Sequence, residues 1–115
     1  MSAQASEQRL IIEMAQGVDL HGRDDTKAAR RAVEQALQGV SLPIFATLGM
    51  ARDAMRVVVH IGVPRPDAVN VDVIAALLPY GSVEVVVKAG GLDVPVAGEV
   101  HVMAVAALEV FLSLR

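Results

Sequence analysis

One stretch of the sequence, GVDLHGRDDTKAARRAVEQAL (residues 17–37), gathers the side-chain types that most often do chemistry in proteins. Its first part holds Asp19 and His21, and Glu13 precedes it by a few residues. An imidazole titrates near neutral pH and a carboxylate can fix its tautomer, so His21 with Asp19 could exchange a proton with a bound molecule. Residues two apart in an extended segment point the same way, so the pair can face one pocket. We therefore treat Glu13, Asp19 and His21 as candidate catalytic residues.

The same stretch offers groups that would hold a small anion. A helix beginning near Asp25 has N–H groups without internal partners and the positive end of its dipole there. Basic side chains in its first two turns would add charge-assisted contacts, and a Gly-Gly pair later in the chain could expose backbone N–H groups. The candidate ligand-binding residues are Lys27, Arg31, Thr26, Gly22, Gly90 and Gly91. If Asp24 and Asp25 already satisfy the helix start, however, the anion has no place to sit.

Two other interpretations of this stretch stay open. Asp19, His21 and Asp24 carry oxygen and imidazole donors that suit Mn, Fe or Zn, so a divalent metal is a candidate cofactor and a metal-dependent hydrolase or lyase an alternative function. The spacing D-x-H-x-x-D is not a specific metal signature. In the plainer interpretation, the acidic residues only cap a helix and the glycines only make a turn. The chain would then be a structural or interaction protein without catalytic activity.

Strand and helix patterns must position these residues. Residues 9–15, 55–64 and 82–89 are short apolar runs with β-branched residues and predict strands. Paired apolar spacing from Asp24 or Asp25 to Gly39 predicts an amphipathic helix, and residues 71–78 predict a second, shorter one. Residues 40–49 and 92–98 each allow a further strand, and residues 100–115 have a helical composition with an almost wholly apolar circumference.

The resulting order, β-α-(β)-β-α-β-(β)-α, predicts a single α/β (α+β) domain over residues 9–115, after a polar tail at residues 1–8. Three or more strands would form a sheet with helices packed on it. The sixteen residues at 100–115 include Glu109 and fall short of the roughly 20 apolar residues that cross a bilayer. We therefore expect a buried helix there and no membrane partner.

The composition indicates self-association. Hydrophobic residues make up 54% of the 115 residues, which is more than so small a domain can cover by itself. We therefore expect a homo-oligomer, with a trimer as the leading hypothesis. A formal net charge of −3 argues against nucleic acid as a partner. The absence of cysteine suits a reducing cytoplasm and excludes a cysteine nucleophile.

With these residues in view, the segments RLIIEMAQGVDLHGRDDTKAARRAVEQAL, VVVHIGVPRPDAV and LPYGSVEVVVKAGGL resemble a family of small bacterial conserved hypothetical proteins. The family starts with an IEMGMGVDLHGQDxTKAAxRAV-like signature, and here Ala15-Gln16 replaces its usual Gly-Met. The resemblance implies no assigned reaction. The element order is also similar to small trimeric proteins of the chorismate-mutase-like type, whose sites lie between subunits, which is an analogy of fold alone.

We therefore expect a cytoplasmic homo-oligomer that binds a small anionic or polar metabolite where the first strand meets the first helix. In this hypothesis the basic side chains hold the anion, and His21 with Asp19 transfers a proton if there is turnover.

Overall fold

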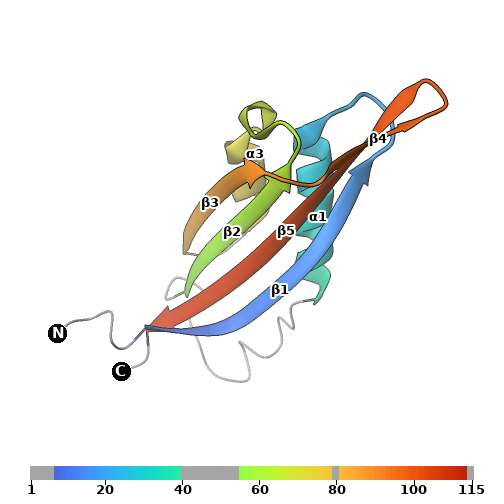
Figure 1. Ribbon diagram of the computed structural model, residues 1–115. Helices are drawn as coiled ribbons and strands as arrows, with labels where there is room; N and C mark the ends of the chain where they lie inside the picture. The colour runs from blue at the N-terminus through green and yellow to red at the C-terminus, as the bar shows by residue number, and fades with distance from the viewer. Residues whose placement is uncertain (1–6, 40–54, 79–80, 114–115) are drawn as a thin grey trace.

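A computed structural model describes residues 7–39, 55–78 and 81–113 of the chain (Figure 1). In these ranges the five strands are β1 (Glu7–Asp19), β2 (Met55–Val63), β3 (Ser82–Ala89), β4 (Leu92–Val96) and β5 (Glu99–Ser113). Helix α1 (Asp25–Gly39) lies between β1 and β2 in the chain. A short 3-10 helix, η3 (Pro66–Ala68), and helix α3 (Val71–Ala75) lie between β2 and β3.

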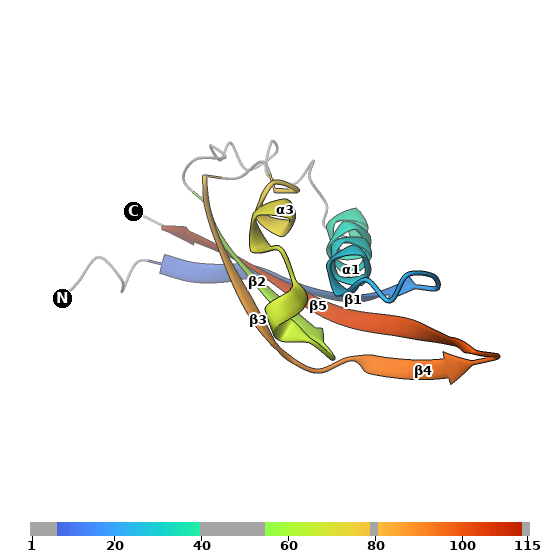
Figure 2. The ribbon, with the colours of Figure 1, turned by 90° about the horizontal axis from the view of Figure 1, so that it is seen from above.

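The strands form one sheet in the order β1-β5-β2-β3, and β4 pairs with the part of β5 that lies beyond β2. Strand β5 runs antiparallel to β1, β2 and β4, whereas β2 and β3 are parallel. Both helices lie on one side of the sheet, so the described part of the chain has two layers and places no helix on the other side (Figure 2). The predicted single α/β (α+β) domain, with three or more strands and helices on the sheet, is confirmed.

Helix α1 lies close to the sheet because both surfaces are built from small residues. Its buried face consists of Ala28, Ala29, Ala32, Val33 and Ala36. A Cβ atom at Gly17 of β1 would collide with backbone atoms of α1, at Ala28, Arg31 and Ala32. The approach of α1 to β1 therefore depends on a glycine at position 17.

The predicted C-terminal helix is wrong, because the segment forms β5, the longest strand of the sheet. Every second side chain of β5 from Val102 to Leu112 is buried against the helices. The other side chains point to the opposite side of the sheet, and many of them are apolar as well, so the period of two that marks a strand is hidden in the sequence. His101, near the start of the predicted helix at 100–115, lies within β5.

Other boundaries shift by smaller amounts. Strand β1 runs from Glu7 to Asp19, so it is longer than the predicted strand at 9–15 and includes the end of the predicted tail. The segment at 92–98 holds β4, as the sequence allowed. Helix α3 spans only Val71–Ala75, and Asn70 caps it by accepting hydrogen bonds from the backbone N–H groups of Asp72 and Val73. The strand allowed at 40–49 lies outside the described residues. None of the helices in the described ranges is long and apolar enough to cross a membrane.

Candidate functional site

The turn between β1 and α1 contains two residues with positive φ, and the direction of its polar groups depends on them. Strand β1 ends at Asp19, Gly22 has φ +89° and Arg23 has φ 53°, and α1 begins at Asp25. Asp24 then caps the helix, because its Oδ1 accepts a hydrogen bond of 3.1 Å from the backbone N–H of Lys27. Carboxylates of the chain itself thus occupy the start of α1. They leave no place there for an external anion.

Asp19 is the central acidic group of this junction and is only 1% exposed. Its Oδ2 accepts a hydrogen bond of 2.9 Å from the backbone N–H of Asp24. Its Oδ1 lies 3.4 Å from Lys27 Nζ and 3.8 Å from Arg31 Nη1, at ion-pair distance but without a directed hydrogen bond. Burial raises the pKa of Asp19, but the hydrogen bond from Asp24 and the charge of Lys27 outweigh it, so the pKa lies below its usual value.

The structure separates the three candidate catalytic residues. The ring of His21 is largely exposed, and its Nδ1 lies 2.9 Å from Glu99 Oε1 rather than at the carboxylate of Asp19. Glu13 lies near the other end of α1, where a Cβ atom at Gly39 would come within 2.7 Å of its Cδ. The junction therefore brings together Asp19, Lys27 and Arg31, while His21 and Glu13 lie apart from that group.

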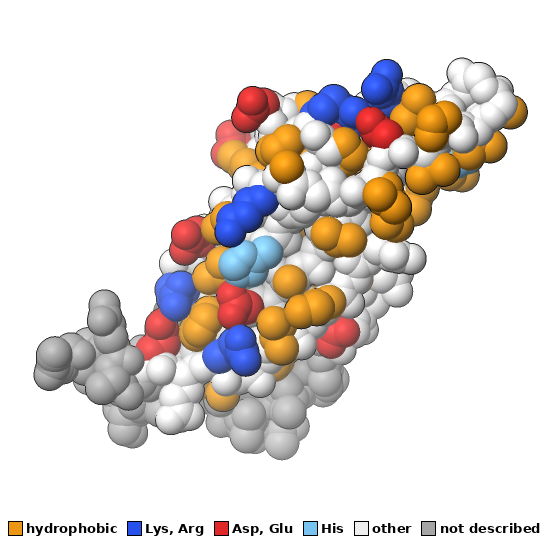
Figure 3. Space-filling view, in the orientation of Figure 1, with side chains coloured by type: hydrophobic (Ala, Val, Ile, Leu, Met, Phe, Trp, Pro, Cys, Tyr) orange, Lys and Arg blue, Asp and Glu red, His pale blue; other side chains and the backbone are white. Residues whose placement is uncertain are grey.

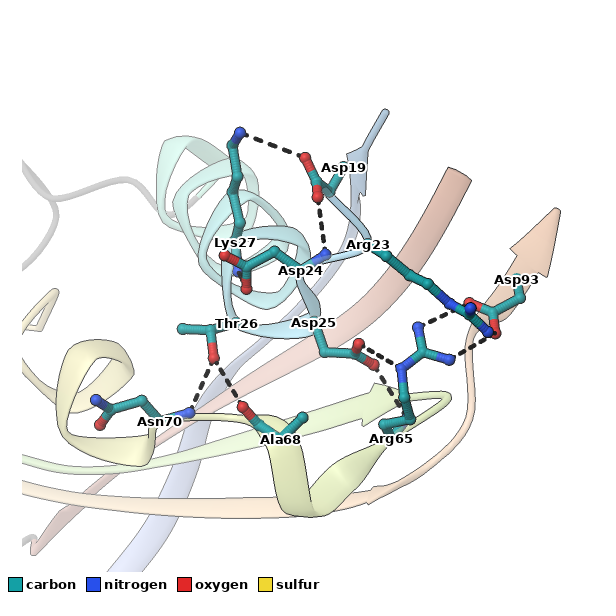
Figure 4. Close-up of polar contacts among 10 residues, drawn as sticks. All are labelled: Asp19, Arg23, Asp24, Asp25, Thr26, Lys27, Arg65, Ala68, Asn70 and Asp93. Carbon is teal, nitrogen blue, oxygen red and sulfur yellow. Dashed lines mark hydrogen bonds and ion pairs between the residues drawn. The ribbon is translucent and has the colours of Figure 1, made fainter. Parts of the chain in front are cut away.

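Two of the candidate ligand-binding residues hold parts of the fold together. Thr26 Oγ1 donates to the carbonyl of Ala68 at 3.1 Å and accepts from the backbone N–H of Asn70 at 3.0 Å, which joins α1 to the segment before α3 (Figure 4). Arg31 Nη1 donates to the carbonyl of Val18 at 2.6 Å. Both side chains thus have partners inside the chain.

Gly90 and Gly91, the remaining glycine candidates, connect β3 to β4. The N–H of Gly90 donates to the carbonyl of Val63 at 2.9 Å, so it is already paired. Gly91 has φ +65°, and a Cβ there would collide with the backbone carbonyl of Met103. These glycines let the chain cross closely over neighbouring strands.

An arginine outside the predicted site joins three elements. Arg65, which follows β2, donates from its backbone N and its Nε to the carboxylate of Asp25 at 3.0 and 2.8 Å. Its Nη1 and Nη2 donate to Asp93 of β4 at 2.6 and 2.9 Å, and Arg23 lies 3.7 Å from the same carboxylate (Figure 4). The Arg65 guanidinium holds the pKa of Asp93 below its usual range, and Asp93 with Asp25 raises the pKa of Arg65.

No local signal in the sequence identifies this group, because its members are 28 and 40 residues apart. Within the described ranges, no three His, Asp or Glu side chains gather closely enough to hold a metal ion. The three metal candidates, Asp19, His21 and Asp24, are directed to different partners: Asp19 to Lys27, His21 to Glu99 and Asp24 to the start of α1.

A hollow lies on the side of the sheet away from the helices, which we call the open face. The hollow has a volume of about 550 Å³ and crosses β1, β5, β2 and β3. Figure 3 shows hydrophobic side chains on this face around a histidine and a band of charged side chains. Its lining is mostly apolar and consists of Met14, Ala15, Gln16, His60, Ile61, Gly62, Lys88, Val105, Ala106 and Ala107.

Most of the charged side chains beside the hollow are paired within the chain. His60 Nε2 lies 2.6 Å from Glu109 Oε1, and Arg9 Nη1 lies 3.3 Å from Glu109 Oε2. The hydrogen bond with His60, aided by Arg9, lowers the pKa of Glu109. Farther along the face, Arg56 binds both carboxylate oxygens of Glu7, at 3.0 and 2.8 Å. None of the ion pairs among the described residues involves Lys88, whose side chain is exposed at the hollow.

Comparison with known proteins supports the family and the fold. A family model described as a conserved hypothetical protein, Lin0512_fam, matches residues 9–110. A crystal structure from Nostoc punctiforme, described as an FtsZ-like protein of unknown function, is 32% identical with a TM-score of 0.82, covering 95% of this chain and 98% of that one. No curated protein matches the chain. The predicted resemblance to a conserved hypothetical family is confirmed, while the chorismate-mutase-like analogy is not tested by these matches.

Proposed function

This chain belongs to the Lin0512 family of conserved hypothetical proteins, and we propose that it is a homo-oligomer that binds a small, mostly apolar carboxylate in the hollow of the open face. The observation that carries the proposal is the hollow itself. Its volume of about 550 Å³ lies within the range of small-molecule sites, and a mostly apolar lining with few polar groups is typical of them.

The polar groups at the hollow suggest the chemistry of the ligand. Lys88 supplies an ammonium group that is not neutralised by an ion pair in the described part of the chain, and Gln16 adds an amide. An apolar lining with one free cation favours an anion on an apolar body. Glu109 stands near His60 but is paired with Arg9 and lies at hydrogen-bond distance from His60 Nε2, so it does not repel the anion as a free carboxylate would.

The polar groups at the junction of β1 and α1, unlike Lys88 at the hollow, already have partners within the described part of the chain. Asp19, Lys27 and Arg31 are engaged with one another, and Asp24 occupies the helix start. The proposal is also one of binding and not of turnover, because Glu13, Asp19 and His21 lie apart. We further propose that the protein acts in the cytoplasm, on the ground that the chain has no cysteine.

Titration calorimetry with octanoate tests the proposal, with octanol as the uncharged probe of equal chain length. We expect saturable octanoate binding with a Kd below about 1 mM, and weaker binding of octanol, since octanol cannot pair with Lys88. The variant Lys88→Gln keeps the length of the side chain and is expected to reduce octanoate affinity about tenfold. Ala107→Leu is expected to reduce the affinity for both probes, because it fills the hollow.

Lys27→Gln combined with His21→Ala is the matched control at the junction, where the sequence had placed the site. We expect this double variant to bind octanoate as the wild type does. Loss of binding in the double variant, together with unchanged binding by Lys88→Gln, would move the site back to the junction. Absence of saturable binding by the wild type would reject the carboxylate as the ligand.

A further inference from the structure

The strand β4 and the start of β5 form an arm, Leu92–Met103, that extends past β2 and β3 (Figures 1 and 2). Strand β1 pairs with β5 at Val102 and Met103, and the rest of the arm is two-stranded. A two-stranded hairpin is marginally stable in water unless something packs against it. Polar contacts fasten the arm to the body: Arg65 and Arg23 bind Asp93, and His21 lies against Glu99. The arm is therefore held in one position relative to the sheet.

The apolar side chains of the arm are exposed where a strand normally carries polar ones. Leu92, Val94 and Val96 alternate along β4 and are 54%, 42% and 42% exposed. The register places Leu92 beside Met103 and Val94 beside His101, on the side of the sheet opposite Val102 and the helices. The apolar side of the arm is thus continuous with the open face.

We propose that a second copy of this chain packs on the apolar surface that the arm shares with the open face. This surface consists of the exposed side chains of Ile12, Met14, Leu92, Val94, Val96 and Val105, of which Met14 and Val105 also line the hollow. The inference rests on the homo-oligomer of the proposed function and names its interface. It does not require the ligand.

The exposed area fits a stable interface. From their exposed fractions, these six side chains present roughly 500 Å² to solvent, about the apolar part of one side of an interface of standard size. The surface has no cover within the described part of the chain, because α1 and α3 pack on the other side of the sheet. An apolar surface of this size on a small domain marks an interaction site.

The charges on the open face favour a second copy over a strongly charged partner. Glu109 is paired with Arg9 and Glu7 with Arg56, so the band carries little net charge. With most of these charges paired, two identical copies approach with little like-charge repulsion, whereas a highly basic or acidic partner gains little. The partner contacts the side chains of the arm and not its free edge, because Pro95 lacks an N–H group there.

Light scattering after size exclusion, with sedimentation velocity over a dilution series, tests the inference on the full chain without ligand. We expect the wild type to be a homo-oligomer in solution. Val94→Glu with Val96→Glu is expected to be monomeric at the same concentrations. Val71→Glu with Val73→Glu is the matched control, since those valines are 44% and 37% exposed on α3, on the helix side. The control is expected to associate as the wild type does.

Val94→Thr with Val96→Thr provides a milder test if the glutamate variant does not fold. Threonine keeps the β-branched shape that suits a strand, and circular dichroism verifies the fold. We expect the threonine variant to raise the dissociation constant about tenfold or more, because two buried apolar groups become polar. A monomeric wild type would reject both the homo-oligomer and this interface. An oligomeric wild type whose arm variants associate as tightly as the α3 control would reject the interface alone.

Discussion

Arg65 holds Asp93 through two parallel hydrogen bonds, from Nη1 to Oδ2 at 2.6 Å and from Nη2 to Oδ1 at 2.9 Å. The same guanidinium reaches Asp25 through Nε, so one side chain connects the end of β2 to both α1 and the arm. The two carboxylates differ in burial: the side chain of Asp25 is 1% exposed and that of Asp93 is 28% exposed. The buried carboxylate is therefore expected to contribute more to stability than the more exposed one.

Asp25→Ala is expected to destabilise the protein more than Asp93→Ala. Removing the buried carboxylate leaves the backbone N–H of Arg65 without its partner, which costs about 2 kcal/mol of unfolding free energy. Removing Asp93 leaves groups that water can reach, so the loss is smaller. Urea unfolding monitored by circular dichroism measures both variants. An equal or larger loss for Asp93→Ala would show that the buried contact is not the stronger one.

Gly17→Ala tests the close approach of α1 to β1. The added methyl would collide with backbone atoms of α1, so the helix must shift, and we expect a loss of about 1 to 3 kcal/mol. Gly98→Ala is the comparison, because Gly98 has φ +86° but nothing within 4 Å of its would-be Cβ. Its loss reflects backbone strain alone, about 1 kcal/mol. Thermal unfolding measures the loss of stability in the two variants. A Gly17→Ala protein as stable as the wild type would refute the steric account.

The sequence predicted most of the elements because their signals are local. The paired apolar positions of α1, with Gly39 at its end, and the β-branched run of β2 follow periodic patterns that a single chain displays. The strand β5 was mistaken for a helix because both of its sides carry apolar residues, and the side that would normally be polar belongs to the open face.

The candidate site was less predictable than the fold. The sequence placed Asp19 and His21 in one pocket on the rule that alternate residues of an extended segment face the same way. Strand β1 ends at Asp19, however, and the positive φ values at Gly22 and Arg23 belong to a turn that directs the chain elsewhere. The hollow depends on Met14, Lys88 and Val105, which come from three strands, and only the strand order brings them together.

Asp19 makes stability depend on acid pH. Its pKa in the folded protein lies below the ordinary value of 3.8, since the N–H of Asp24 and the ammonium of Lys27 outweigh the effect of burial. A carboxyl with a lowered pKa contributes stability above its unfolded pKa and loses it as the pH falls through its folded pKa. Asp19→Asn is therefore expected to be less stable than the wild type at neutral pH, with a difference that shrinks below about pH 4.

Urea unfolding from pH 7 to strongly acidic pH measures that difference. Asp93 and Glu109 also have lowered pKa values, so the wild type loses stability in acid through several groups, and only the comparison with Asp19→Asn isolates one of them. Asp67→Asn removes an exposed carboxylate and serves as the control, expected to follow the wild type at every pH. A constant gap between the wild type and Asp19→Asn down to the lowest pH would contradict the assignment.

Thr26 is expected to act through its hydroxyl in joining α1 to the segment before α3. Thr26→Val keeps the shape of the side chain but removes both the donor to Ala68 and the acceptor for the N–H of Asn70, so we expect a loss of about 1 kcal/mol. Thr26→Ser retains the hydroxyl and is expected to stay within a few tenths of a kcal/mol of the wild type. Hydrogen exchange at the Asn70 amide separates this role from a general loss of packing. Faster exchange in Thr26→Val and not in Thr26→Ser supports the bond, whereas equal exchange in the two variants would assign the effect of valine to packing.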